Sequence, residues 1–308
     1  MGLISSFYKK AFLIRYDKDE AIPYYSVEDF PEMKVEKHTF INSKGAEIYY
    51  FFYYYSEPKR NIVALFCPGM GPGHTAYFAE INALCKAGYK VLTLDYTGCG
   101  ESDGETMFSV NAPTRDVNEL LNLLQLKDEI IILGHSLGGY TALNISNLRN
   151  DISKTVVISG FLSIENEMIG LSKSRFMGWR VKKFEQKNDP EYAFINNIEY
   201  LKTTNDKIMF MQSTDDKMVA YRNALGYVKE LNRPNIECVV VNNKGHNPLY
   251  SDDAVVYMNN TFYNYNRLIK NKTLNTLEKR KEFMSDKSIE KMTEIDSDLM
   301  DIILEFIK

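Results

Sequence analysis

The sequence predicts an α/β fold in which a mostly parallel central β-sheet carries helices on both faces. Short apolar segments alternate along the 308 residues with segments whose apolar residues recur three and four positions apart. This alternation is typical of strands joined by crossover helices. The segments from residue 61 onward are apolar on both faces, as strands buried between two helical layers should be. With 44% hydrophobic residues, the chain can bury the core of one α/β domain, or of one domain with an insertion.

The first two predicted strands, 38–42 and 47–55, precede any crossover helix. The short turn sequence NSKG joins them, so we expect a hairpin at an antiparallel edge of the sheet. Helices are predicted over 75–88 and 112–126, where the apolar spacing suits a helix that covers a sheet. The remaining strands are predicted at 61–67, 90–96, 129–134, 154–160, 207–213 and 236–242.

The alternation breaks between residues 161 and 206, where scattered aromatic and methionine residues lie on a mixed-charge background. This composition predicts a small helical cap inserted between two strands. The core domain would then comprise residues 1–160 and 207–308. Its last part, 251–308, is strongly charged but ends in helical apolar spacing, which predicts a helical tail with disorder around 271–292.

Composition and charge exclude several classes of function. The net charge of −4 and pI near 5.7 give no basic field, so nucleic acid is a poor partner and a small molecule a better one. The four cysteines lie far apart without a CxxC pair, which predicts reduced thiols and no metal site. No stretch of about 18 apolar residues and no secretory leader is present, so we expect a cytoplasmic protein without a transmembrane segment. The oligomeric state is not predictable from these features.

One motif carries a chemical hypothesis. The sequence GHSLG, residues 134–138, follows a predicted buried strand and precedes a helical pattern, which is the context that gives G-x-S-x-G its meaning. Glycines allow a sharp turn between strand and helix, and the turn would raise the hydroxyl of Ser136 at the carboxyl end of the sheet. The helix that follows offers free N–H groups for a developing oxyanion. A serine that only caps the helix is the alternative.

A base and an acid follow Ser136 in the chain. Of the four histidines, His38, His74, His135 and His246, only the last lies just beyond the final predicted strand, where a loop could bring its imidazole to Ser136. The acid should follow another strand, and residues Asp215 and Asp216 lie after the strand at 207–213. One of the two could fix the tautomer of the imidazole and one could cap the next helix. The residues alone leave that choice open.

The chain resembles the α/β-hydrolases, near the serine aminopeptidase and monoglyceride lipase-like branch. The matching blocks are CPGMGPGH, DYTGCGESDG, RDV, GHSLGG, D-x-x-V and GHNP, over roughly residues 60–250. The resemblance implies an α/β-hydrolase fold with Asp216 as the acid. It also implies that the backbone N–H groups of Met70 and Leu137 bind the oxyanion, and that Asp95 supports a structural turn. This chain has Pro68 where relatives have histidine, so a side chain that often steadies the Met70 loop is missing.

These features predict a cofactor-free serine hydrolase that cleaves a small-molecule carboxylic ester through an acyl-enzyme, with Ser136, His246 and Asp216 as its triad. A serine aminopeptidase or amidase, with Glu165, Glu167 or Glu185 of the cap binding a free amino terminus, is the alternative. Thioester cleavage on the same triad and a non-catalytic binding protein are further alternatives. An apolar acyl pocket in the cap would be lined by Phe161, Met168, Phe176, Met177 and Trp179, although these side chains could equally pack the cap onto the core.

Overall fold

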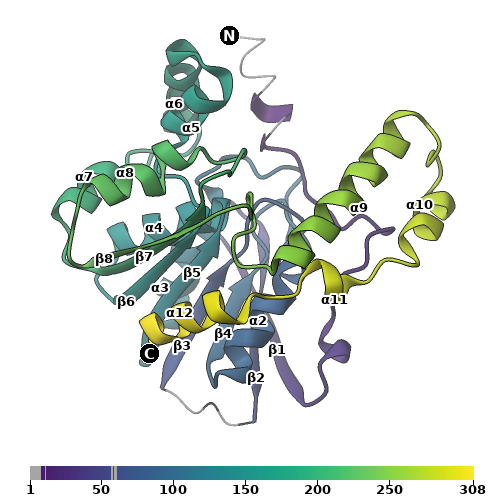
Figure 1. Ribbon diagram of the computed structural model, residues 1–308. Helices are drawn as coiled ribbons and strands as arrows, with labels where there is room; N and C mark the ends of the chain where they lie inside the picture. Colours follow the sequence, from purple (N-terminus) through teal and green to yellow (C-terminus); the bar gives the residue numbers. More distant parts are fainter. Residues whose placement is uncertain (1–7, 11, 57, 59–60) are drawn as a thin grey trace.

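The computed structural model describes residues 8–10, 12–56, 58 and 61–308, and its centre is an eight-stranded sheet (Figure 1). The strand order is β1-β2-β4-β3-β5-β6-β7-β8. Strands β3 to β8 are parallel, and the hairpin of β1 and β2 joins the sheet antiparallel to β4. The predicted fold class and the predicted edge hairpin are therefore confirmed. The strands are β1 (Met33–Ile41), β2 (Glu47–Tyr55), β3 (Ile62–Cys67), β4 (Lys90–Leu94), β5 (Glu129–His135), β6 (Ile152–Ile158), β7 (Lys207–Ser213) and β8 (Ile236–Val241).

Strand β1 begins at Met33 and not at residue 38 as predicted. Most of its side chains are exposed because it forms the edge of the sheet. An edge strand with little buried surface carries charged residues and lacks the apolar pattern of a buried strand. The start of the strand was therefore not predicted, because residues 33–37 lack an apolar strand pattern.

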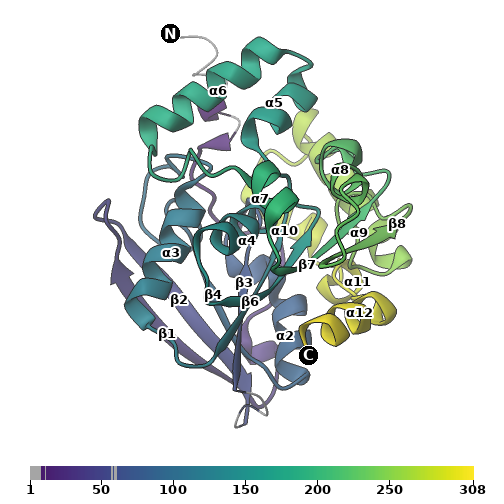
Figure 2. The same ribbon diagram turned by 90° about the vertical axis from the view of Figure 1, so that its left-hand side faces the viewer.

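Helices cover both faces of the sheet (Figure 2). Strand β5 shows how the faces are divided, because Ile130 and Ile132 pack into one core cluster while Ile131 and Leu133 pack into the other. This period of two places the strand between two apolar layers. One layer contains α2 (Phe78–Lys86) and α12 (Ser297–Ile307), and the other contains α3 (Ala112–Leu124), α4 (Leu137–Leu148), α7 (Asn197–Thr203) and α8 (Leu225–Glu230).

The segment predicted as a cap contains three helices with two different surroundings. Helices α5 (Ile164–Ser172) and α6 (Arg175–Asn188) pack against each other and stand beyond the carboxyl ends of the strands (Figure 1). Helix α7 packs against α4, and its Leu201 is fully buried in a core cluster with residues of β6 and β7. Helix α7 thus covers the sheet, while α5 and α6 form the part that overhangs it. We call this α5–α6 pair the cap.

The C-terminal region is helical, with α9 (Asp252–Lys270), α10 (Leu277–Met284) and α11 (Ile289–Met292) before α12. The disorder predicted around 271–292 is wrong. Met284 and Met292 are buried in one cluster with Tyr265 of α9 and with Ala21 near the start of the chain. Few but well-placed apolar residues order this charged stretch, which composition alone does not reveal. The described residues also form the short 3₁₀ helices η1 (Val27–Asp29), η2 (His74–Tyr77) and η3 (Tyr221–Asn223).

Candidate active site

Ser136 lies on a sharp turn between β5 and α4. Its backbone has φ 56° and ψ −118°, a conformation that residues with a side chain rarely adopt. The turn requires glycine at its second flank, because a Cβ on Gly138 would lie 1.9 Å from the carbonyl oxygen of Cys67. The Ser136 N–H is held by the carbonyl oxygen of Ile158 on the neighbouring strand, at 2.8 Å. The local structure is that of a nucleophile turn, with the serine at the carboxyl edge of the sheet.

The structure brings Asp216 and His246 together. Oδ2 of Asp216 lies 2.9 Å from Nδ1 of His246, and the aspartate side chain is fully buried. Its other oxygen accepts the N–H groups of Met218 and Val219 at 2.9 and 3.0 Å. Burial alone would raise the pKa of Asp216, but the hydrogen bond and charge of His246 and the two N–H groups hold it below its ordinary value. One aspartate thus both contacts the imidazole and caps the following turn.

Asp215 has a different position. Its carboxylate is exposed and accepts hydrogen bonds from the hydroxyl of Ser213 and, at 3.1 Å, from the N–H of Gly245. It therefore fixes the loop that leads to His246 without contacting the imidazole. Of the two aspartates that the sequence left open, Asp216 is the one beside His246.

His246 lies beside the nucleophile turn. Its ring centroid is 4.8 Å from that of His135, the residue before Ser136. Because Nδ1 is bound to Asp216, Nε2 is the nitrogen left for a proton transfer. Nε2 is buried and has no hydrogen-bond partner within the described part of the chain. It therefore does not form a hydrogen bond with Ser136 Oγ in this structure. Such bonds commonly tighten only when substrate binds.

The loop after β3 lies against the same turn. A Cβ on Gly69 would come within 3.4 Å of the Ser136 Cβ, which places Met70, the next residue, near the hydroxyl. Tyr96 donates a hydrogen bond of 3.1 Å to the carbonyl oxygen of Pro68 and so holds the start of this loop. Leu137 is the first residue of α4, so its N–H lies among those that a helix leaves without an intrahelical partner.

The five aromatic and methionine residues predicted to line an acyl pocket do not come together. Phe161 and Met168 are buried in the core cluster that contains Leu137, whereas Phe176 and Trp179 stack on each other with 58% and 46% of their surface exposed. Met177 is partly exposed. Only Phe161, which precedes α5, and Met168 of α5 therefore pack in the core cluster beside the nucleophile turn.

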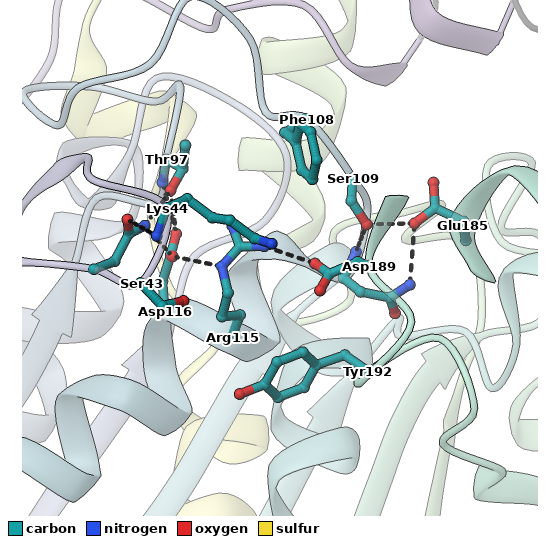
Figure 3. A network of polar contacts seen from close by, with 12 residues as sticks. Ser43, Lys44, Thr97, Phe108, Ser109, Arg115, Asp116, Glu185, Asp189 and Tyr192 are labelled. Carbon is teal, nitrogen blue, oxygen red and sulfur yellow. Dashed lines mark hydrogen bonds and ion pairs between the residues drawn. The ribbon is translucent and has the colours of Figure 1, made fainter. Parts of the chain in front are cut away.

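Figure 3 shows how a buried polar network fixes the cap to the core. Glu185 of α6 accepts hydrogen bonds from Tyr8 at 2.9 Å, from the amide of Asn111 at 3.0 Å and from the hydroxyl of Ser109. One helical turn later, Asp189 accepts a 2.7 Å bond from Nη1 of Arg115. All of these side chains are buried. The cap is thus held by hydrogen bonds and a buried ion pair as well as by apolar packing.

The three cap glutamates differ in their partners. Glu165 forms an ion pair with Lys182 at 2.7 Å, and Glu185 belongs to the network just described. Glu167 is only 8% exposed, and its carboxylate has no hydrogen-bond or ion-pair partner among the described residues. Burial, and secondarily the negative charge of Asp216, raises the pKa of Glu167 to about 7. Glu167 is therefore the cap carboxyl group whose pKa is affected by the charge of Asp216.

A second buried histidine–aspartate pair lies away from Ser136. Nδ1 of His74 is 2.8 Å from Asp95, and its Nε2 is 2.9 Å from the hydroxyl of Tyr53. Asp95 also accepts the backbone N–H groups of His74 and Glu101. Both ring nitrogens of His74 are therefore occupied, and the pair holds two loops together. His38 lies in the edge strand β1.

The described residues hold no cluster of histidine, cysteine, aspartate or glutamate that could bind a metal ion. Cys67, Cys85 and Cys99 are buried, Cys238 is partly exposed, and all four are free. No helix of the described chain has both the length and the apolar character that crossing a membrane requires.

Sequence reasoning missed two residues that contact this site. Tyr77 lies 3.0 Å from Nδ1 of His135, and Nε2 of the same imidazole lies 2.7 Å from the carbonyl oxygen of His246. No pattern in the sequence would have indicated Tyr77, because only the folded chain brings it there.

Comparisons with known proteins agree with this fold. Residues 57–223, more than half of the chain, match the family described as "Serine aminopeptidase, S33". A proline iminopeptidase of Saccharolobus solfataricus is 30% identical over 122 residues, and an epoxide hydrolase of Caballeronia sordidicola is 31% identical over 94 residues. These matches cover 39% and 30% of this chain, and only 39% and 29% of the relatives' own lengths.

A solved structure is similar over a longer stretch. An esterase of Pyrococcus furiosus superposes with a TM-score of 0.58 at 16% identity, covering 83% of this chain and 98% of the esterase. At this identity the likeness establishes the fold alone. Together with the family match, it shows that the chain belongs to the serine aminopeptidase S33 family and has the α/β-hydrolase fold.

Proposed function

We propose that this protein is a serine hydrolase that cleaves carboxylic esters through an acyl-enzyme and needs no cofactor. The observation that carries the proposal is the 2.9 Å hydrogen bond between Asp216 and His246. The other imidazole nitrogen has no hydrogen-bond partner in the described part of the chain and lies beside the strained turn that presents Ser136. A hydroxyl nucleophile, a base within reach and a carboxylate that orients the base are the components of acyl transfer by serine.

Acylation would begin with attack of Ser136 Oγ on the ester carbonyl carbon while His246 Nε2 accepts the hydroxyl proton. The carbonyl oxygen becomes an oxyanion, which the backbone N–H groups of Met70 and Leu137 would stabilise. Asp216 would stabilise the imidazolium and keep its Nδ1–H directed away from the substrate. The imidazolium then gives its proton to the leaving alcohol as the carbon–oxygen bond breaks. Water, activated by the same imidazole, would release the acid and restore Ser136.

The nucleophile distinguishes this proposal from epoxide hydrolysis. Epoxide hydrolases of this fold normally use a carboxylate at the turn, and here Ser136 stands there. The 30% of the chain that is similar to such an enzyme therefore supports the shared fold and not its chemistry.

A fluorophosphonate probe and a series of p-nitrophenyl esters of increasing acyl length test the proposal. We expect covalent labelling and ester hydrolysis by the unaltered protein, and loss of both in Ser136→Ala. Ser146→Ala is the matched control, because Ser146 lies on the same helix and its hydroxyl bonds to Tyr200. Labelling that persists in Ser136→Ala, or a protein that hydrolyses no ester of the series, would contradict the proposal.

A serine aminopeptidase on the same triad is the second candidate, and Glu167 favours it. Recognition of a free amino terminus needs a carboxylate that is not neutralised by another residue, and Glu167 is buried, unpaired among the described residues and influenced by the charge of Asp216. The likeness of part of the chain to a proline iminopeptidase supports the same candidate. Comparing aminoacyl p-nitroanilides with the ester series separates the two functions.

A further inference from the structure

Three loops of the site are joined by one close packing contact and two consecutive hydrogen bonds. The Tyr77 hydroxyl packs against Gly69 and lies 3.0 Å from Nδ1 of His135. Nε2 of His135 lies 2.7 Å from the carbonyl oxygen of His246. The series therefore runs from the loop before Met70, across the nucleophile turn, to the loop of the base.

Only one arrangement of protons satisfies this series. The carbonyl oxygen of His246 can only accept, so His135 must carry its proton on Nε2. Burial, and secondarily the neighbouring His246, lowers the pKa of His135 to about 3, so the imidazole is neutral and Nδ1 is an acceptor. Tyr77 must then donate to Nδ1.

The packing around Tyr77 is specific to this contact. A Cβ on Gly69 would lie 2.3 Å from the Tyr77 hydroxyl, so the close approach depends on glycine at that position. Burial raises the pKa of Tyr77, against a smaller opposing effect of the Gly69 N–H, so the phenol stays protonated and able to donate. Pro68 offers no side-chain hydrogen bond to the loop, and the Tyr77 hydroxyl packs directly against the next residue, Gly69.

We propose that Tyr77 and His135 are positioning residues that hold the Met70 loop and the His246 loop in register on either side of Ser136. The inference rests on the proposed serine hydrolase function. Met70 would bind the oxyanion and His246 would move the proton, so both loops must keep their distance from one hydroxyl to within a fraction of an ångström. Loops without such ties move more than the strands that carry them.

Tyr77→Phe tests the first contact. It removes the hydroxyl, leaves Nδ1 of His135 without its donor and frees the imidazole to move its proton off Nε2. We expect kcat for the best p-nitrophenyl ester to fall by about 10- to 100-fold while KM changes by less than about twofold. Tyr55→Phe is the control, because Tyr55 also donates through its hydroxyl, to Asn82 at 2.7 Å, but lies at the opposite end of β2 from the site. Equal kcat in Tyr77→Phe and the unaltered protein would overturn the inference.

Two variants of His135 separate positioning from folding. His135→Gln keeps a donor that can reach the His246 carbonyl oxygen, and we expect it to retain more of kcat than His135→Leu, which fills space without a donor. Thermal unfolding of each variant shows whether the folded fraction is the same. If the two variants lose kcat equally at equal folded fraction, the hydrogen bond does not position His246.

The proton arrangement can be measured without any substrate. Long-range ¹H–¹⁵N correlation spectra should show His135 as a neutral imidazole protonated on Nε2 from about pH 5 to pH 8. A proton on Nδ1, or titration of His135 within that range, would overturn the inference even if a variant failed to fold. Failure of the proposed function looks different, because the unaltered protein would then show neither probe labelling nor hydrolysis while the spectrum of His135 stayed as described.

Discussion

Asp216 and His246, thirty positions apart in the chain, meet through a 2.9 Å hydrogen bond between Oδ2 and Nδ1. The loops that follow β7 and β8 bring them together, because neighbouring parallel strands end at the same edge of the sheet. The same carboxylate also accepts two backbone N–H groups, so it cannot rotate away from the imidazole without losing them. The turn that follows β7 thus fixes the Asp216 carboxylate, and the carboxylate fixes the orientation of the His246 imidazole.

We predict that Asp216→Asn lowers kcat of the ester reaction by about 1,000- to 10,000-fold. The amide fits the same space but cannot accept Nδ1–H from His246 as a carboxylate does, so the wrong tautomer is favoured. Asp215→Asn is the matched control, since it changes a neighbouring carboxylate that touches Gly245 and not the imidazole. Steady-state kinetics check both variants, and an equal loss in the two would show that Asp216 has no special role.

The nucleophile turn should tolerate no side chain at Gly138. Gly138→Ala would place a Cβ 1.9 Å from the backbone oxygen of Cys67, and backbone cannot yield as a flexible side chain does. We expect the free energy of unfolding to fall by about 3 kcal/mol or more, measured by urea denaturation. Gly71→Ala in the adjacent loop has nothing within 4 Å of the added atom and should be near neutral. Similar losses in both variants would contradict the steric explanation.

Glu80 should make the protein less stable as the pH rises. The residue is 5% exposed, and one carboxyl oxygen lacks a hydrogen-bond partner among the described residues. Burial raises the pKa of Glu80 from 4.5 to about 7. Between these two values the folded state binds a proton that the unfolded state has lost, so the stability from this group is full below pH 4.5 and is lost as the pH rises through 7.

Replacing Glu80 by glutamine removes that dependence. We predict that Glu80→Gln raises the free energy of unfolding at pH 8 by up to about 3 kcal/mol and has much less effect near pH 4.5. Urea denaturation at the two pH values gives both differences. A gain of the same size at both would mean that protonation of Glu80 is not the cause.

Removing only the arginine of the Arg115–Asp189 ion pair should lower the free energy of unfolding strongly. Arg115→Met would leave Asp189 and the neighbouring Asp116 buried without their cation (Figure 3), and we expect a loss of about 3 to 5 kcal/mol. Arg149→Met is the control, because Arg149 pairs with the half-exposed Asp151 and should lose less than about 1 kcal/mol. Adding Asp189→Leu to Arg115→Met should recover part of the loss. Urea denaturation measures each, and no recovery would argue against a buried unpaired charge as the cause.

The fold and Ser136 were predictable because they depend on short-range patterns. Apolar alternation located every parallel strand, and the glycines around Ser136 follow from the steric demands of a turn within five residues. Contacts between distant segments were not predictable in the same way. Phe161 is buried and Trp179 is exposed because of the way in which the segment around α5 and α6 packs on the core. The amino-acid composition of this segment would be the same in either orientation, so composition could not predict which side chains are buried.

The sequence order of serine, acid and base pointed to His246, but it could not exclude a competing pair on physical grounds. His74 and Asp95 also form a buried histidine–aspartate contact. Only the structure shows that both nitrogens of His74 are already bound, whereas Nε2 of His246 has no partner among the residues that the structure describes. The position of Tyr77 likewise depends on how η2 folds back over Gly69, for which no local pattern exists.

Glu167 offers the sharpest separation of the ester and aminopeptidase candidates. If its carboxylate binds the ammonium group of a substrate, Glu167→Gln should lower kcat/KM for aminoacyl p-nitroanilides by about 10- to 100-fold and change that for neutral esters little. Because burial raises the pKa of Glu167 to about 7, the carboxylate forms as the pH rises through 7. In the unaltered protein, kcat/KM for the anilide divided by kcat/KM for the ester should therefore rise across that pH range. In Glu167→Gln the same ratio, corrected for ionisation of the substrate amine, should not change with pH. Glu165→Gln, which changes a carboxylate already paired with Lys182, is the matched control and should keep the rise. If the pH dependence of this ratio changes equally in Glu167→Gln and Glu165→Gln, Glu167 does not bind the substrate amine. The ester hydrolase function would then remain the proposal, without a carboxylate that selects amines.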